Sequence, residues 1–166
     1  FVDDVIRPVR YAYAEDFVDG LKRLSDSNLR KYTMKYVLGK FAQHLDEAAY
    51  STSLEIDHYV GRSVEVEHIL PITDTDEIVA VFGGREAVER CKHRLANLTP
   101  LERSLNSVVS NKRFPEKLKG YAESKFIITK GLHPDVGVGD DNKIRQALSL
   151  VGSYEDWTLE AFQDRE

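Results

Sequence analysis

Apolar residues recur at helical spacing over two long stretches in the first third of the chain. Residues 9–24 place Tyr13, Phe17, Leu21 and Leu24 on one side of a helix. Residues 29–50 repeat the pattern with Met34, Val37, Leu38, Phe41 and Leu45. The sequence SDSN at 25–28 separates the two stretches, because Ser, Asp and Asn favour helix ends and caps. We therefore predict two helices that pack as a hairpin and supply core.

The pattern changes to strict alternation at residues 64–68, VEVEH, which predicts a short strand that ends before Pro71. Residues 54–60 fit either a strand or an irregular lead-in, and 94–100 fit a second strand that ends at Pro100. Helices are predicted at 85–93, 101–114, 115–126, 141–150 and 157–165, with a loop or an edge strand at 127–140. The order in the middle of the chain is thus strand, long loop, strand, helix.

Composition places the chain among ordinary globular proteins. It has 166 residues, of which 42% are hydrophobic and 31% charged, which suits one domain with a real core. No apolar run reaches the length of a membrane span, so no membrane partner is expected. The single cysteine, Cys91, excludes an internal disulfide framework and a Cys-rich zinc site, and a reducing cytoplasmic location is expected. The chain lacks an initiator Met, as expected for a piece of a longer protein.

Charge is unevenly distributed along the chain, although the net charge is −5. Residues 85–130 hold 11 Lys and Arg against 5 Asp and Glu, a surplus of 11 − 5 = +6, and both flanks are acidic. A basic segment of this kind is more often a solvated helix face than a binding surface. It indicates nucleic-acid binding only if catalytic chemistry lies beside it.

The strand at 64–68 ends with an acid and a histidine side by side, Glu67 and His68. Imidazole is a natural general base near neutral pH, and a carboxylate is a hard oxygen ligand for Mg²⁺ or Mn²⁺. Adjacent strand residues point to opposite faces, so both can serve one site only where the strand ends. The pair alone is weak evidence, since Asp57 and His58 form another pair, for which a structural role is expected.

Three asparagines follow at spacings that extend this chemistry. Asn97 lies inside the second predicted strand, where Asn is disfavoured unless it forms a turn or bulge. Asn106 lies on the next predicted helix and Asn111 near its end, and amide oxygens can bind hard cations. Which of Asn106 and Asn111 is the ligand stays open, with Asn106 preferred. His93 is expected at the surface, with a phosphate contact as the alternative.

In its order of motifs, EHILP, HRLANLTPL, LN and NKRF, the chain resembles the C-terminal HNH nuclease domain of GmrSD-type restriction endonucleases, a branch of the His-Me finger or ββα-metal nucleases. The resemblance is tight over about residues 64–126 and looser over the flanks. Ala96 stands where the family normally has Gly, a small change. Such proteins usually carry an N-terminal nucleotide-sensing domain, so the resemblance implies a sensor domain in the same polypeptide as a partner.

The resemblance implies a role for each motif residue. His68 is the general base that deprotonates water, and Asn97 holds the metal loop and orients the histidine. Glu67 and Asn106 bind one divalent metal, Mg²⁺ or Mn²⁺. The residues expected to contact double-stranded DNA are Lys112, Arg113, Lys117 and Lys119. The implied activity is metal-dependent DNA hydrolysis, with nicking expected of a single site, in restriction or defence against phage.

The fold expected from pattern and resemblance together is α+β, mostly helical, with a small ββα-metal core near 62–112. A single HNH nuclease domain would span 1–166, with a helical hairpin at 1–53, the HNH core at 54–126 and C-terminal helices at 127–166. The alternative is a catalytically degenerate HNH fold that serves as a DNA- or protein-binding module. The complete set of base, acid and asparagines favours the enzyme, because a scaffold has no need of a general base.

Overall fold

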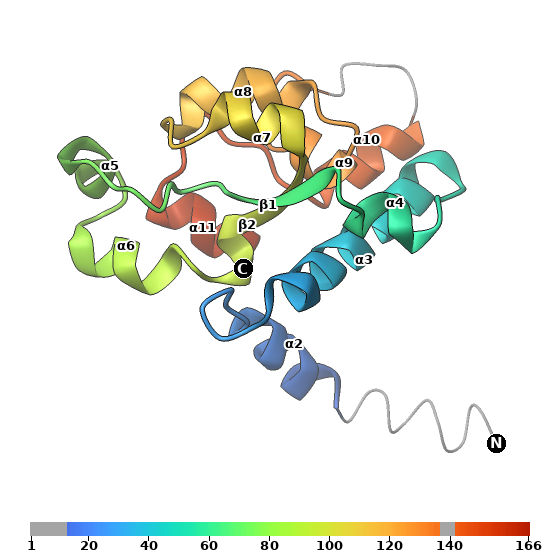
Figure 1. Ribbon diagram of the computed structural model, residues 1–166, viewed down its shortest axis with the longest axis horizontal. Helices are drawn as coiled ribbons and strands as arrows, with labels where there is room; N and C mark the ends of the chain where they lie inside the picture. The colour runs from blue at the N-terminus through green and yellow to red at the C-terminus, as the bar shows by residue number, and fades with distance from the viewer. Residues whose placement is uncertain (1–12, 137–141) are drawn as a thin grey trace.

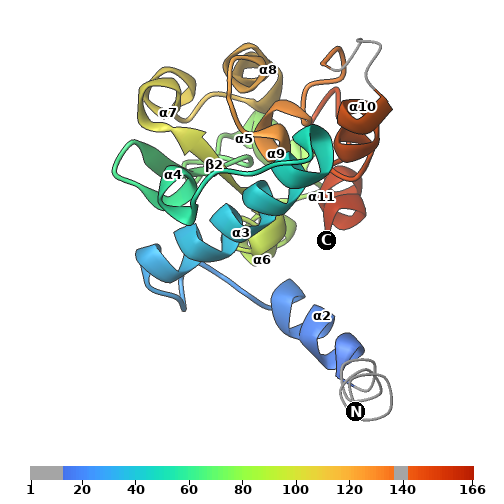
Figure 2. The same cartoon turned by 90° about the vertical axis from the view of Figure 1, so that its right-hand side faces the viewer.

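The computed structural model describes residues 13–136 and 142–166, and within them the fold is α+β and mostly helical (Figures 1 and 2). The helices before the first strand are α2 (Ala14–Lys22), α3 (Lys31–Tyr50) and α4 (Ile56–Val60). The central elements are β1 (Val64–His68), α5 (Asp76–Val81), α6 (Arg85–Cys91), the 3₁₀ turn η2 (Leu95–Asn97), β2 (Leu98–Glu102) and α7 (Arg103–Val109). The remaining helices are α8 (Phe114–Ala122), α9 (Ile127–Lys130), α10 (Asn142–Ser149) and α11 (Leu159–Arg165).

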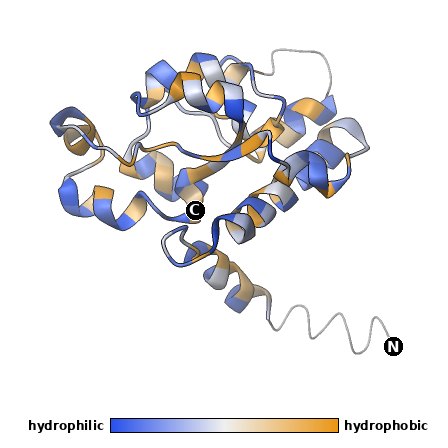
Figure 3. Ribbon diagram, viewed as in Figure 1, coloured by the Kyte–Doolittle hydropathy of each residue, from blue (hydrophilic) through white to orange (hydrophobic). Residues whose placement is uncertain are grey.

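The sheet formed by the described residues is a single antiparallel pair, β1 with β2. Its register opposes Glu67 to Thr99 and His68 to Leu98. β1 runs through the centre of the molecule (Figure 3), and its two valines alternate with hydrophilic residues. Helices α7 and α8 lie on one side of it and α3 on the other, so the sheet is covered on both faces (Figures 1 and 2). The order of strand, strand and helix is the one that the sequence predicts, but the connection between the strands contains α5 as well as the predicted helix α6.

The core has a large part and a small part. The large part joins α4 to α9 and the C-terminal helices, with Tyr59, Phe82, Tyr121 and Trp157 among its buried side chains. The small part lies where α3 meets the sheet, and consists of Met34, Leu38 and Leu98 with Val66 beside them. Burial of these apolar groups stabilises the sheet against α3, because each fully buried side chain contributes about 1.5–3 kcal/mol. The cores fix both faces of β1 and hence the direction of its last two side chains.

The first helix corrects one sequence prediction. α3 supplies core, but none of the nine residues of α2 is buried, and Tyr13 and Phe17 are about two-thirds exposed. α2 contacts η2 rather than pairing with α3 as a hairpin. The predicted hairpin is therefore wrong, because Tyr13 and Phe17 of its apolar stripe stay exposed. The part of that predicted helix at 9–12 lies outside the described residues.

Three local predictions also need correction. Residues 56–60 form helix α4, not a strand. The second strand is Leu98–Glu102, not 94–100, because residues 95–97 form η2 and delay its start. Residues 127–130 are helical, not an edge strand, while 137–141 lie outside the described residues. No helix among residues 13–136 and 142–166 is both long and apolar enough to cross a membrane.

Candidate active site

The end of β1 places Glu67 and His68 on opposite sides of the strand, as adjacent strand residues must lie. Glu67 contacts α8, whereas His68 contacts the loop between α2 and α3. Both nevertheless line one cavity of about 580 Å³. The cavity is also lined by Asp26, Lys31, Met34, Val66, Ile72, Asn106, Ser107, Ser110, Asn111 and Lys117. Because β1 ends there, the acid and the histidine reach the same space.

Glu67 is buried, and one of its two carboxylate oxygens accepts hydrogen bonds from neighbouring side chains. Its Oε1 accepts hydrogen bonds from Lys117 Nζ at 2.7 Å and from the Tyr121 hydroxyl at 2.9 Å. Its Oε2 accepts no hydrogen bond from a side chain among the described residues. Burial raises the pKa of Glu67, and the Lys117 ammonium opposes that rise. The charged carboxylate is thus held by one oxygen while the other remains available to a ligand.

Lys117 does not lie where the sequence analysis expected a DNA contact. Its side chain is 1% exposed, and its ammonium also donates to the backbone oxygen of His68 at 2.6 Å. Burial lowers the pKa of Lys117, and the Glu67 carboxylate opposes that change. The ammonium therefore ties α8 to the end of β1 rather than facing solvent.

The other predicted DNA contacts differ in exposure. Lys112 and Lys119 are exposed, as the expectation requires. Arg113 is half-buried and forms ion pairs with Glu77 and, at 3.7 Å, with Asp156. A guanidinium that already holds two carboxylates is less available to a phosphate. Two of the four predicted cations thus remain on the surface without such a constraint.

His68 is packed against a carboxylate that the sequence analysis did not identify. Its Nε2 lies 2.8 Å from Asp26 Oδ2, and the imidazole is mostly buried. The second oxygen, Oδ1, lies 2.8 Å from Nδ1 of His93. Burial lowers the pKa of His68, and Asp26 opposes this effect. His68 is thus disposed to be neutral near pH 7, the form that can accept a proton.

Asp26 carried no recognisable signal in the sequence, because the segment SDSN is typical of a helix boundary. Its position depends on pairing between distant segments. Ser25 and Arg94 form an isolated β-bridge, and the Asp26 amide donates to the backbone oxygen of His93 at 3.0 Å. These bonds carry the loop to the edge of β2, whose first residue, Leu98, lies opposite His68.

Asn97 is fully buried and bridges two loops rather than lining the cavity. Its Oδ1 accepts from the Leu70 amide at 2.7 Å and from Trp157 Nε1 at 3.0 Å. Its Nδ2 donates to the backbone oxygens of Leu70 at 3.1 Å and Lys92 at 2.7 Å. Two of these four contacts hold Leu70 in the loop that follows His68, and the other two connect Asn97 to Lys92 and Trp157.

Asn106 provides the test of whether these residues suit a divalent metal. Its Oδ1 is buried in the wall of the cavity and has no hydrogen-bond partner among the described residues. A buried amide oxygen without a partner costs about 1–3 kcal/mol, which a cation in the cavity would offset. Together with the free Oε2 of Glu67 it forms a pair of oxygen donors suited to Mg²⁺ or Mn²⁺. Asn111 also lines the cavity but is exposed.

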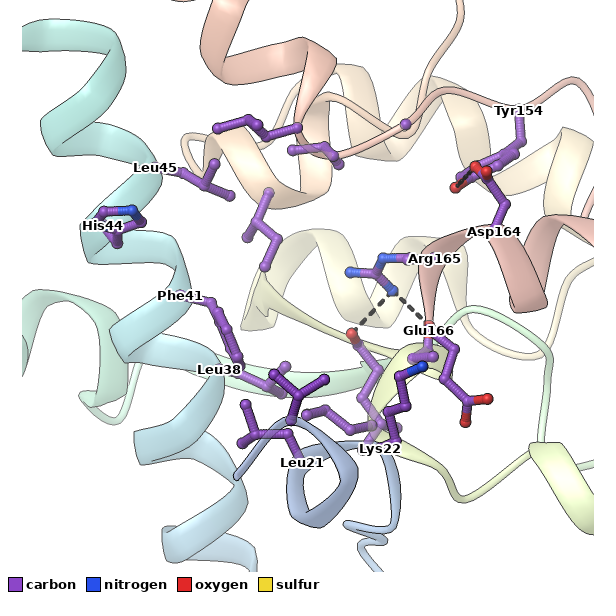
Figure 4. A pocket seen from close by; sticks show the side chains of 18 of the residues that line it. Leu21, Lys22, Leu38, Phe41, His44, Leu45, Tyr154, Asp164, Arg165 and Glu166 are labelled. Atoms are coloured by element: carbon purple, nitrogen blue, oxygen red, sulfur yellow. Dashed lines mark hydrogen bonds between the residues drawn. The ribbon is translucent and has the colours of Figure 1, made fainter. Parts of the chain in front are cut away.

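A second groove, of about 540 Å³, lies between α2, α3 and the C-terminal residues (Figure 4). Its walls are largely apolar and include Phe41, which projects from α3 (Figure 4). At its rim the Tyr154 hydroxyl donates to Asp164 at 2.9 Å, and Arg165 donates to the backbone oxygen of Ala96 at 2.7 Å. Because these groups are already bonded within the chain, the groove offers packing surface rather than groups for hydrolysis.

The fold and the first cavity together define a small α+β domain with an acid–histidine pair at the end of its first strand. Comparison with protein families then gives a match over residues 11–166 to the C-terminal domain of GmrSD restriction endonucleases. The chain belongs to that family, as the motifs at 64–126 predicted. Comparison with curated proteins and with solved structures gives no match.

Proposed function

We propose that this domain is a metal-dependent DNA endonuclease of the HNH type that nicks double-stranded DNA. The observation that supports it best is the buried, unpartnered Oδ1 of Asn106 in the same cavity as Glu67 and His68. A base, an acidic ligand and a neutral ligand around one accessible space are the groups that phosphodiester hydrolysis requires.

His68 acts as the general base in this proposal. Its burial lowers the pKa of the imidazole, so the neutral form dominates at physiological pH. Water that enters the cavity loses a proton to the ring and attacks the phosphorus atom. Loss of such a base typically lowers the rate by about 10²–10⁴.

Glu67 and Asn106 would hold one Mg²⁺ or Mn²⁺ through Oε2 and Oδ1. When bound, the ion neutralises charge on the scissile phosphate and stabilises the leaving oxygen. Lys117 and Tyr121 fix Oε1 of Glu67, so the carboxylate need not reorganise to present Oε2. Asn97 is not a metal ligand in this proposal, since its side chain holds the loop after His68.

Double-stranded DNA is the proposed substrate, and the exposed Lys112 and Lys119 would contact its backbone. The family name refers to restriction, so a role against foreign or phage DNA follows from this proposal. An N-terminal sensor domain in the same polypeptide would control when cutting occurs, and a cytoplasmic location agrees with that role.

The test is plasmid nicking by the purified domain in Mg²⁺ or Mn²⁺, with a chelator as the metal-free control. His68→Ala should abolish nicking, whereas His44→Ala, at an exposed position on α3, should not change it. If the domain binds the plasmid but does not nick it with either metal, the proposed nuclease activity is contradicted. The alternative of a DNA-binding module without catalytic activity would then be supported.

The ligand assignment has its own comparison. Asn106→Ala should lose nicking activity, and a higher Mn²⁺ concentration should restore part of it. Asn111→Ala should have a milder effect, because Asn111 is exposed. An inactive Asn111→Ala beside an active Asn106→Ala would transfer the ligand role to Asn111 without contradicting nuclease activity.

A further inference from the structure

The contact between Asp26 and His68 joins a loop near the N-terminus to the end of β1. The two residues are 42 positions apart by number, yet Asp26 Oδ2 lies 2.8 Å from His68 Nε2. His93 Nδ1 lies 2.8 Å from the other oxygen of the same carboxylate. The two imidazole rings are edge to face, with centroids 5.9 Å apart. One carboxylate thus bridges two histidines, and one of them is the proposed base.

The nitrogen that faces Asp26 cannot be the one that meets water. His68 Nε2 is buried from solvent, whereas the imidazole lines the cavity. A carboxylate oxygen at 2.8 Å repels a nitrogen lone pair and attracts an N–H, so the proton of the neutral ring belongs on Nε2. The lone pair of the neutral ring is then on Nδ1.

We propose that Asp26 is a positioning residue for His68, which keeps the proton on Nε2 and leaves Nδ1 to accept a proton from water. This inference rests on the proposed nuclease function. In the step, one proton moves from water to Nδ1 as the water oxygen bonds to phosphorus and the bond to the leaving oxygen breaks. The leaving oxygen takes a proton from solvent, and the imidazolium later releases its own. Asp26 stabilises that imidazolium, and His93 holds Asp26 by its second oxygen.

The same three residues could instead hold a metal ion, since their nearest ligand atoms lie within 4.8 Å of one another. The distances favour the positioning role. Two ligands of one tetrahedral Zn²⁺ are separated by about 3.3 Å, because each lies about 2.0 Å from the ion. The separations of 2.8 Å between Asp26 and each histidine are those of direct contact, a hydrogen bond to His93 and an ion-pair distance to His68.

The experiment compares Asp26→Ala, Asp26→Glu and the control Asp19→Ala, since Asp19 lies on exposed α2 and its side chain makes no hydrogen bond or ion pair with described residues. Two properties are measured on the whole 166-residue chain. The first is the tautomer of His68, from ¹⁵N shifts of its ring, assigned with His68→Gln. The second is plasmid nicking, resolved into kcat and KM, with thermal unfolding as the check on folding.

We expect the wild-type His68 ring to carry its proton on Nε2, and Asp26→Ala to shift it to a mixture of tautomers. In Asp26→Ala, kcat should fall about 10- to 100-fold with KM for DNA unchanged, a smaller loss than without the base. Asp26→Glu should recover part of kcat, and Asp19→Ala should match the wild type.

Three results would overturn the inference. They are a wild-type proton on Nδ1, a folded Asp26→Ala that nicks at the wild-type rate, and stoichiometric Zn²⁺ binding that shifts both His68 and His93 and is lost in Asp26→Ala. A wild type that nicks nothing but shows the Nε2 tautomer would contradict the proposed nuclease instead. The positioning of His68 by Asp26 would still be measured in that case.

Discussion

At the scale of single residues, the ion pair between Lys117 and Glu67 is the interaction of the site whose burial costs the most desolvation free energy. Two charges leave water, and each is compensated mainly by the other, at 2.7 Å. Lys117→Met should lower the free energy of unfolding by about 3–5 kcal/mol, because it leaves a buried carboxylate unpaired. Urea denaturation measures the change.

Lys119→Met is the matched control for that variant, since Lys119 lies on the same helix and is exposed. Its effect should stay within about 0.5 kcal/mol. The double variant Lys117→Met with Glu67→Gln should recover part of the loss, because the unpaired charge is gone. A Lys117→Met protein as stable as the wild type would show that the pair is open to solvent.

Asp46 gives a pH-dependent prediction away from the site. Burial raises the pKa of Asp46, whose Oδ2 accepts from the Tyr59 hydroxyl at 2.8 Å while Oδ1 is buried without a hydrogen-bond partner among the described residues. A carboxyl with a raised folded-state pKa binds more protons folded than unfolded, so its contribution to stability is complete at low pH and lost as pH rises through that pKa. Asp46→Asn should therefore stabilise the protein at pH 7 and lose this advantage near pH 3.

The measurement is the free energy of unfolding of both proteins from pH 3 to pH 8. Asp57→Asn serves as control, because Asp57 is exposed and its side chain makes no hydrogen bond or ion pair with described residues. A constant difference between Asp46→Asn and the wild type across this range would contradict the prediction.

At the scale of elements, the site depends on how the two strands end. β1 was predictable because its alternation is local, and α3 because its apolar stripe spans many turns. The start of β2 was not predictable from local sequence. Asn97 ends the turn η2, and its side chain accepts hydrogen bonds from the distant residues Leu70 and Trp157. The chemistry of Glu67, His68 and Asn106 followed from motifs, whereas burial of Lys117 and the role of Asp26 depend on partners about 40–50 residues away.

The Asn97 contacts make a prediction about the loop between β1 and α5. Asn97→Ala removes four hydrogen bonds and leaves buried groups of Leu70, Lys92 and Trp157 without partners. Unfolding free energy should fall by more than about 3 kcal/mol, since each unsatisfied buried group costs about 1–3 kcal/mol. Asn28→Ala, at an exposed position whose side chain makes no hydrogen bond with described residues, should have little effect. If a thermal scan finds the two variants equally stable, the hydrogen bonds of Asn97 do not stabilise the loop as predicted.

At the scale of the whole molecule, the net charge of −5 opposes DNA binding, whereas the basic segment at 85–130 favours it. Long-range attraction of DNA is weak, so binding depends on local exposed cations. Folding has removed some of them from the surface, since Lys117 is buried and Arg113 is paired with Glu77 and Asp156. The expectation of four phosphate contacts is thereby reduced to Lys112 and Lys119.

This reduction can be tested through the salt dependence of binding. Each phosphate contact contributes about 0.9 to the slope of log K against log salt concentration, because it releases counterions. Lys112→Glu with Lys119→Glu should therefore weaken plasmid binding at low salt and lower the slope by about 2. Lys40→Glu makes half of that change of charge on α3, on the other side of the sheet (Figure 1), and should alter the slope by far less than half as much. Equal slopes for the double variant and the wild type would show that DNA approaches another face, and that Lys112 and Lys119 are only solvated.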